Sequence, residues 1–212
     1  MTRFRFQLTQ GVINKSLDCL AQRDKRIAQA LKQVGYPETR RRDQGFAALA
    51  QIIVGQQVST HAARAITARL VAELGGEVTP QAVQQKDDGL LRSVGLSRQK
   101  VTYLRSLTEA VLAGALPVDK LHTLTDSEAI DRITAVKGFG EWSAHMYLMF
   151  ALGRPDVWPV GDLAVRAGFG QIMALDERPT PAQTFALATP FAPHRSALAL
   201  LCWKVYSEAP LS

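Results

Sequence analysis

The sequence predicts an all-α protein of about ten helices. Apolar residues recur every three or four positions through most of the 212-residue chain, which is the period of a helix that buries one face. The alternation of apolar and polar residues that marks a half-buried strand is scarce. Ser, Thr, Asp or Pro stands before many of the periodic segments and Gly stands after several, as at the starts and ends of helices. These observations favour helices packed on helices over a fold that contains a sheet.

The N-terminal part is expected to begin with two helices joined by a basic segment. The first helix covers 14–34, because its apolar residues lie roughly on one face and Gly35 and Pro37 then stop it. The segment R-R-R-D at 40–43 leads to a second helix over 46–58. The apolar face of the first helix is made of Leu17, Leu20, Ile27, Leu31 and Val34.

Capping residues and prolines mark most starts of the remaining helices. A Ser, Thr or Asp side chain accepts a hydrogen bond from the open amides of a first turn, and proline suits the first helical position. The expected starts are Ser59, Thr79-Pro80, Ser97, Thr125 or Ser127, Glu141, Asp162, Thr180-Pro181 and Pro193. The expected ends, where the sequence assigns them, are Leu74 before Gly75-Gly76, Ala113 before Gly114, Ala135, and about Leu152.

The charge of the chain is compatible with a polyanionic partner. The net charge is +6, from 25 Lys and Arg against 19 Asp and Glu. Nucleic acid is the usual partner of a basic surface. The same charge is equally compatible with a basic protein that has no such partner.

Cysteine content and hydropathy exclude several classes of protein. The chain has two cysteines, Cys19 and Cys202, too few for a disulfide framework or for the four thiolates of an iron–sulfur cluster. Reduced thiols in a cytosolic protein are the expected state. No apolar run approaches the roughly 20 residues of a membrane span, and the N-terminus has no apolar signal core. We therefore expect a cytoplasmic protein of bacterial type with no membrane partner.

The segment V-K-G-F-G-E-W-S-A at 136–144 places a two-glycine turn between two expected helices. Gly138 and Gly140 let the backbone bend tightly and remove side chains that would keep a ligand away. The open amides at the start of the second helix form an anion site, for which a DNA phosphate is a suitable anion, and Lys137 adds a charge. The alternative is an ordinary turn between helices with Phe139 in the core, and Phe139 is expected in the core in both cases.

Four motifs in order carry a resemblance to a known family. The motifs are A-L-A-Q-I-I-V-G-Q-Q-V-S-T at 48–60, V-G-L-S-R-Q-K at 94–100, K-G-F-G-E-W-S-A at 137–144 and P-V-G-D-L-A-V at 159–165. Together they resemble the helix-hairpin-helix DNA glycosylase superfamily, and the first two resemble its 3-methyladenine DNA glycosylase II branch. The resemblance covers roughly residues 18–206.

The resemblance implies a fold of two all-α lobes with the active-site cleft between them. One lobe would be built from both ends of the chain, residues 1–43 and 155–212. The other would cover 44–154 and contain the helix-hairpin-helix at about 125–152. Some family members carry an additional N-terminal β-domain, which is not expected in a chain of this length.

The resemblance places the family's catalytic carboxylate at Asp162. Breakage of an N-glycosidic bond builds positive charge on the sugar, and a carboxylate beside the sugar stabilises that charge. Asp162 follows Gly161 at an expected helix start, where amides and the helix dipole favour the ionised side chain. It could also orient the attacking water. The alternative without the resemblance is a plain N-cap aspartate, the commonest use of Asp at such a position.

Trp142 bears on both the mechanism and the substrate. Bifunctional relatives place a lysine at this position, second after the last hairpin glycine, and an indole cannot form the Schiff base that such a lysine forms. The resemblance thus implies a monofunctional hydrolase that leaves an abasic site. An alkylated purine such as 3-methyladenine or 7-methylguanine is cationic, and a tryptophan face attracts a cation by roughly 0.5–2 kcal/mol. A core tryptophan on the second hairpin helix is the alternative.

Further site residues are implied by the resemblance alone. Met146 and His194 stand where relatives often have aromatic residues of the base pocket, and Trp158 would either pack near the site or anchor its loop. Gln57 matches the wedge that fills the gap left by the extruded base, with Gln56, Val58 and Ser59 beside it; exposed glutamines at a helix end are the alternative. Other expected DNA contacts are Lys137, Gly138, Phe139 and Gly140. Arg195 and Lys100 are candidate phosphate contacts, with a solvated surface charge as the alternative. Backbone carbonyls near Val136, Gly138 and Phe139 would bind a monovalent cation, Na⁺ or K⁺.

The resemblance as a whole implies a monomeric base-excision repair enzyme. It would release alkylated purines from double-stranded DNA and require no cofactor. Three alternatives stay open: a non-catalytic helix-hairpin-helix DNA-binding module, a glycosylase of the same fold that prefers deaminated or etheno-adducted purines, and a helical protein–protein adaptor.

Overall fold

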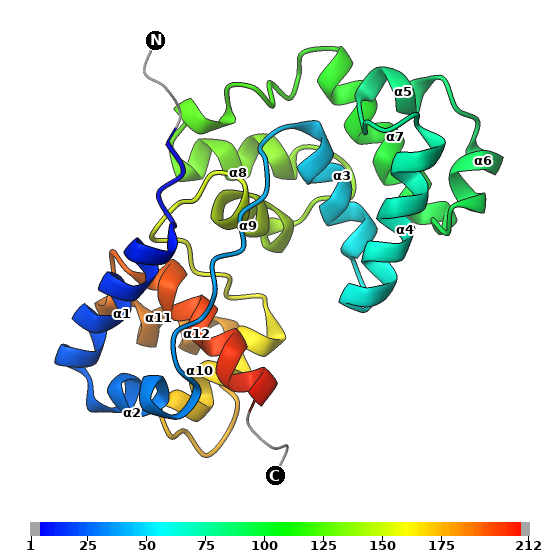
Figure 1. The fold of residues 1–212 in the computed structure, drawn as a ribbon. Coiled ribbons are helices and arrows are strands. Elements are labelled where there is room, and N and C mark those ends of the chain that lie inside the picture. The colour runs from blue at the N-terminus through cyan, green and yellow to red at the C-terminus, as the bar shows by residue number, and fades with distance from the viewer. Residues whose placement is uncertain (1–4, 209–212) are drawn as a thin grey trace. The chain divides into compact units, whose positions relative to one another are not determined.

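The computed structural model describes residues 5–208 and confirms the all-α prediction. Within this range it contains twelve α-helices, two short 3-10 helices and no strand (Figure 1). The helices belong to two compact units. The terminal unit holds the chain up to Arg41 and from Leu148 onward, and the central unit holds Arg42–Tyr147.

Both ends of the chain build the terminal unit. The blue α1 and α2 of Figure 1 pack against the red α12, and α10 packs on both α12 and α2. The helices of this unit are α1 (Gln10–Arg23), α2 (Lys25–Val34), α10 (Leu163–Ile172), α11 (Pro181–Ala188), the 3-10 turn η2 (Thr189–Phe191) and α12 (Arg195–Glu208).

The central unit contains the other helices. In it α3 packs on α4 and α7, and α5 and α6 pack on α7. Its elements are α3 (Phe46–Gly55), α4 (Thr60–Glu73), α5 (Pro80–Gln84), α6 (Asp88–Ser93), α7 (Arg98–Leu112), the 3-10 turn η1 (Leu121–Thr123), α8 (Asp126–Thr134) and α9 (Glu141–Phe150), whose last residues from Leu148 belong to the terminal unit.

The prediction of one helix over 14–34 was wrong. Asp24 interrupts it with an extended backbone, and its carboxylate accepts from the amide of Arg26, so that it caps the start of α2. The helix expected over 46–58 ends at Gly55. The short helix α6, capped by Asp87, was not predicted.

The close contact of α10 with α12 depends on Gly168. A Cβ atom at this position would lie 2.0 Å from the carbonyl oxygen of Cys202, so no other residue fits without moving a helix. Around this contact the Phe169 ring packs edge-on against Trp158 and Phe191. Cys202 is fully buried here, and burial raises the pKa of its thiol well above the ordinary value. The packing fixes the first residues of α10 relative to the last turns of α12.

The central unit contains a fully buried tyrosine. Tyr147 is fully buried, and its hydroxyl accepts a hydrogen bond of 2.9 Å from the amide of Gly45, the residue before α3. Burial raises the pKa of Tyr147 to about 12. Within residues 5–208, no helix has both the length and the apolar character needed to cross a bilayer.

Candidate active site and nucleic-acid interface

Asp162 is the N-cap of α10, as the sequence predicted. Its backbone is extended, and its Oδ1 atom accepts a hydrogen bond of 2.9 Å from the amide of Val165. Its own amide donates to the carbonyl of Pro159 at 2.9 Å, which closes the loop before the helix. The side chain is half-buried.

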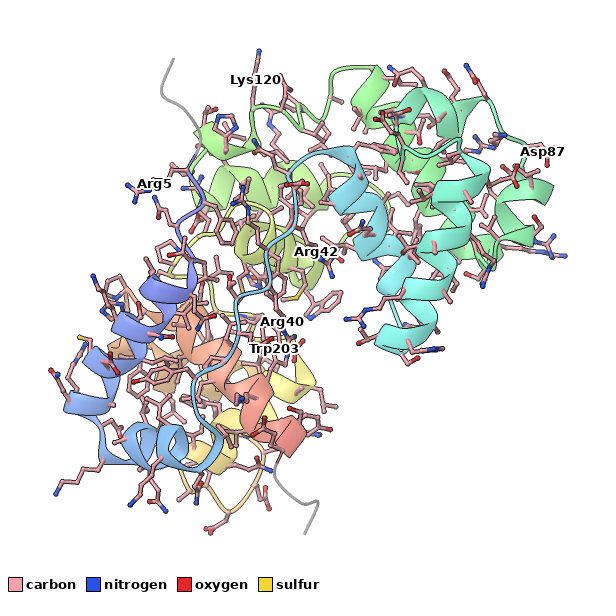
Figure 2. All side chains as sticks on the ribbon, in the orientation of Figure 1. Arg5, Arg40, Arg42, Asp87, Lys120 and Trp203 are labelled. Carbon is pink, nitrogen blue, oxygen red and sulfur yellow. The ribbon has the colours of Figure 1, made fainter. Side chains whose placement is uncertain are left out.

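A second donor to Asp162 comes from the last helix of the chain. The indole Nε1 of Trp203, on α12, donates to Asp162 Oδ1 at 3.0 Å. The Trp203 ring lies 5.7 Å from that of Phe150, and the guanidinium carbon of Arg40 lies 5.8 Å from the indole centroid. Figure 2 labels Arg40 and Trp203 next to each other. Trp203 was not predicted as a site residue, since a single tryptophan in a C-terminal helix has the same local pattern as a core residue.

The hairpin between α8 and α9 has the expected two-glycine turn. Gly138 has φ +100°, and a Cβ atom there would lie 2.2 Å from the Tyr103 ring, so both backbone and packing require glycine. Phe139 is buried, as expected, and its amide donates to the carbonyl of Val136 at 3.1 Å. Lys137 and Gly140 are exposed on the turn. The capping box of Thr125 and Glu128 fixes the start of α8.

The segment after α3 contacts the hairpin through Gln56. Its side-chain amide donates to the carbonyl of Gly138 at 2.9 Å and to the hydroxyl of Ser143 at 3.4 Å. Gln57 is exposed and has φ +55°, a left-handed backbone that is uncommon for this residue type. Ser59 caps α4 through a bond to the amide of Ala62. Gln56 therefore acts inside the protein as a link, while Gln57 projects from the turn.

A polar pocket of about 330 Å³ lies beside this link. Lys100 forms one wall and is only 9% exposed; its Nζ donates to the carbonyl of Val54 at 2.7 Å, near the end of α3. Burial lowers the pKa of Lys100. The sequence left Lys100 as a phosphate contact or a solvated surface charge. The surface alternative was wrong, because the side chain is buried with its ammonium group bound to the Val54 carbonyl. The pocket is lined by Gln56, Gln57, Val58, Ser97, Gln99, Lys100, Tyr103 and Gly138.

The four expected base-pocket residues differ in their surroundings. Trp142 is half-buried on α9, and Met146, one turn further on, is buried. Trp158 is buried edge-on against Phe169, the contact expected of a residue that anchors the loop. His194 Nδ1 lies 3.1 Å from the hydroxyl of Ser16, which ties the start of α12 to α1.

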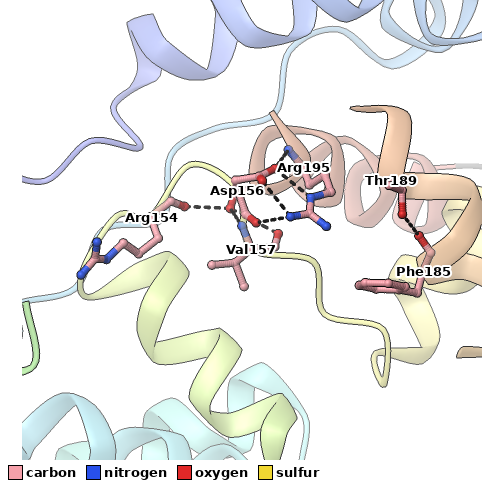
Figure 3. A network of polar contacts seen from close by, with 7 residues as sticks. Arg154, Asp156, Val157, Phe185, Thr189 and Arg195 are labelled. Atoms are coloured by element: carbon pink, nitrogen blue, oxygen red, sulfur yellow. Dashed lines mark hydrogen bonds and ion pairs between the residues drawn. The ribbon is translucent and has the colours of Figure 1, made fainter. Parts of the chain in front are cut away.

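Arg195 forms a two-bond ion pair with Asp156. Its Nε and Nη2 atoms donate to the two carboxylate oxygens at 2.8 and 2.7 Å, and Nη2 also reaches the Asp156 carbonyl at 3.2 Å (Figure 3). The adjacent hydroxyl of Ser196 donates to the carbonyl of Arg154 and accepts from the amide of Val157. These bonds attach the 154–157 loop to the start of α12. A phosphate contact by Arg195 stays a prediction.

The carbonyls proposed to hold a cation already accept hydrogen bonds. Val136 accepts from the amide of Phe139, and Gly138 accepts from the side chain of Gln56. A carbonyl oxygen has two lone pairs, so each is compatible with a second, weak ligand. Over residues 5–208, no group of three or more His, Cys, Asp or Glu side chains is arranged to bind a metal ion.

The fold and these residues define a class of DNA repair proteins. Residues 50–193 match the family described as HhH-GPD superfamily base excision DNA repair protein, and the chain belongs to this family.

Several individual members of the family are similar to this chain over most of its length. The chain is 33% identical over 159 residues to DNA-3-methyladenine glycosylase 1 of Schizosaccharomyces pombe, covering 74% of this chain and 70% of that protein. It is 33% identical over 153 residues to the DNA-3-methyladenine glycosylase of Saccharomyces cerevisiae, covering 68% of this chain and 51% of that protein. The solved structure of the S. pombe glycosylase Mag1 in complex with abasic DNA superimposes with a TM-score of 0.85 at 31% identity, covering 92% of this chain and 98% of that one.

Proposed function

We propose that this protein is a monofunctional DNA glycosylase that hydrolyses the N-glycosidic bond of alkylated purines in double-stranded DNA. The observation that carries the proposal is the similarity over most of the chain to enzymes named DNA-3-methyladenine glycosylase. A second observation supports the proposal: Asp162 lies within the matched residues, and Val165 and Trp203 donate hydrogen bonds to its carboxylate. The product is an abasic site.

In this mechanism Asp162 acts on the sugar of an extruded nucleotide. The bond between C1′ and the base nitrogen breaks, and its electron pair leaves with the base. The carboxylate stabilises the positive charge that forms on the sugar. Water then adds to C1′, and its proton passes to the carboxylate. An alkylated purine carries a positive charge before the bond breaks and leaves as a neutral base.

The position that decides between hydrolysis and strand cleavage carries Trp142. Without an amine here, no Schiff base forms with the sugar, so the enzyme leaves the DNA strand intact. Borohydride added during the reaction should therefore trap no protein–DNA crosslink. A trapped crosslink would contradict the monofunctional assignment.

Trp142 is also proposed as the aromatic face that holds a cationic base. Met146, Trp158 and His194 complete the proposed pocket. The family resemblance implies aromatic side chains at the positions of Met146 and His194, so the second candidate is a glycosylase of the same fold that releases deaminated or etheno-adducted purines. Trp142→Ala should reduce release of methylated bases more than it reduces DNA binding, and unchanged release would exclude Trp142 from the pocket.

Double-stranded DNA is proposed to contact the hairpin and the segment after α3. The exposed Gln57 is the proposed wedge, and Ser59, Lys137 and Gly140 are proposed backbone contacts together with Phe139 and Arg195. Gln57→Ala should slow base release from duplex DNA more than from single-stranded DNA, because only the duplex needs its gap filled. An equal effect on both substrates would reject the wedge.

A monovalent cation is proposed at the carbonyls of Val136 and Gly138. Such an ion, when bound, supplies positive charge to a nearby phosphate. DNA affinity in KCl should then exceed that in choline chloride at the same ionic strength. Equal affinities would argue against the cation.

The central experiment measures the bases freed from methylated duplex DNA by chromatography. The wild type is expected to release 3-methyladenine and 7-methylguanine, and Asp162→Asn to release them about 100–1,000 times more slowly. Asparagine caps a helix as well as aspartate does, and its amide oxygen still accepts from Val165 and Trp203. The variant therefore removes the charge while keeping the fold, which thermal unfolding should confirm.

Two results would overturn the proposal. Equal release by wild type and Asp162→Asn would remove Asp162 from catalysis. Absence of release by a folded wild type that binds DNA would leave a non-catalytic DNA-binding module.

A further inference from the structure

We propose that Trp203 is the positioning residue for the Asp162 carboxylate, and that Arg40 holds the indole in place. This inference rests on the proposed function, in which Asp162 is catalytic. The three side chains come from three separate segments of the terminal unit: the extended segment after α2, the start of α10, and α12.

The Asp162 carboxylate is held both by its own helix and by a residue distant in sequence. The amide of Val165 bonds Oδ1 at 2.9 Å, as in any capped helix. Trp203 adds a second bond of 3.0 Å to the same oxygen from a different helix. The Trp203 bond therefore adds a tertiary constraint on the Asp162 carboxylate to the local one that the helix cap supplies.

The indole of Trp203 is itself held by neighbouring side chains. An indole N–H lies in the ring plane, so Trp203 turns its edge to Asp162 while its ring face is available to other groups. Phe150 packs against the ring at 5.7 Å, and the Arg40 guanidinium lies over it at 5.8 Å. A cation over an indole withdraws electron density from the ring and makes the N–H a better donor. The Gly168 contact with Cys202 sets the spacing of α10 and α12.

The carboxylate must lie beside the sugar when charge develops there, and a misplacement of about 1 Å can cost about 100-fold in rate. Trp203 donates to the carboxylate and is not itself proposed to contact the nucleotide. Loss of its N–H should therefore reduce the chemical step and leave DNA binding largely intact.

The test is a double-mutant cycle of Trp203→Phe and Asp162→Asn, read by single-turnover release of 7-methylguanine from methylated duplex DNA. Trp203→Phe keeps an aromatic ring and removes the donor. It should slow release about 10- to 100-fold, and change the affinity for a duplex with an abasic-site analogue by less than about twofold. In the Asp162→Asn background it should have almost no further effect.

The possible results separate the two proposals. Full activity of Asp162→Asn would overturn the proposed function. Loss of activity in Asp162→Asn together with a wild-type rate in Trp203→Phe would overturn only the positioning role. An equal loss from Trp203→Phe in both backgrounds would show that Trp203 acts independently of Asp162, which also overturns it.

A spectroscopic measurement tests the hydrogen bond without any substrate. The indole N–H resonance of Trp203 in ¹⁵N-labelled protein, identified by its loss in Trp203→Phe, should shift upfield in Asp162→Ala and exchange faster with solvent. The resonance of Trp158 is the internal control, because its indole nitrogen is buried without a hydrogen-bond partner. A Trp203 resonance that does not respond would exclude the bond in solution.

Arg40 has a matched control in the next residue. The guanidinium of Arg41 lies over Phe6 at 5.3 Å and makes the same kind of contact away from Trp203. Arg40→Gln should slow base release about two- to fivefold and shift the Trp203 resonance, whereas Arg41→Gln, which removes the same charge, should do neither. Equal effects of the two variants would overturn the part assigned to Arg40.

Discussion

His145 and Lys100 are ionisable side chains that the central unit buries, at 7% and 9% exposure. Burial lowers the pKa of both, because a charge is poorly solvated in the interior. For His145 burial outweighs the opposing effect of Glu141, whose carboxylate lies 3.7 Å from Nε2, and of Asp126. Lys100 compensates for its burial with a bond to Val54. Each residue makes stability depend on its protonation state.

The pH dependence of stability follows for His145. Its pKa in the folded state lies below the value of 6.5 for a free histidine. As pH falls below about 6.5, the unfolded chain gains the proton before the folded one, so the free energy of unfolding decreases, by up to about 1.4 kcal/mol per pH unit. Urea denaturation at pH 7.5 and 5.5 should show this loss, and His145→Leu should reduce it.

The same substitution at an exposed histidine provides the control. His61→Leu should keep the pH dependence of the wild type. If His145→Leu and the wild type lose equal stability between the two pH values, His145 is not the source of the pH dependence.

At the scale of elements, the end of α3 and the hairpin are joined by Gln56. Gln56→Leu removes the donor to Gly138 and Ser143 while keeping a similar volume. It should lower the free energy of unfolding by about 1–2 kcal/mol, since it leaves a half-buried carbonyl without its partner. Chemical denaturation measures this difference.

Gln57 supplies the matched control for that substitution. Gln57→Leu is the same change at the next residue, where the side chain is exposed. It should change stability by no more than about 0.5 kcal/mol. A loss as large as that of Gln56→Leu would mean that the effect is general to this turn.

The predicted elements were accurate where local chemistry determines them. Caps at Ser59, Ser97, Thr125 and Thr180 each start a helix as expected. The break at Asp24 was missed because the apolar residues keep helical spacing across it, while the decisive hydrogen bond is a single local contact.

The candidate site was only partly predictable for a related reason. The motif and the helix start predicted Asp162, and its N-cap position is confirmed. Trp203 lies 41 residues from it, and Gln56 lies 82 residues from Gly138. Contacts at such separation leave no periodic or local signal in one sequence, so they become visible only when the helices are packed.

At the scale of the whole molecule, the net charge of +6 should make the affinity for DNA depend on salt concentration. Each phosphate that a Lys or Arg neutralises releases counterions, so affinity falls with salt at a slope of about −0.9 per contact. With about three to six contacts, affinity for an abasic duplex should fall by roughly 40- to 2,000-fold between 50 and 200 mM KCl.

Fluorescence anisotropy measures this titration. Asp162→Asn should keep the slope of the wild type, since it neutralises no phosphate. Affinity that does not respond to salt, or no affinity at all, would instead favour a helical adaptor without a DNA role.

The deep burial of one cysteine has a practical use. Cys202 is sealed between α10 and α12, and its thiol remains protonated, whereas Cys19 on α1 is only half-buried. Thiolate is the reactive form of cysteine. A maleimide dye should therefore attach to Cys19 alone in the native protein and give a singly labelled derivative without mutagenesis. Cys202 would become modified only on unfolding, so the rate of its labelling would report the rate at which the terminal unit, which contains Asp162, unfolds.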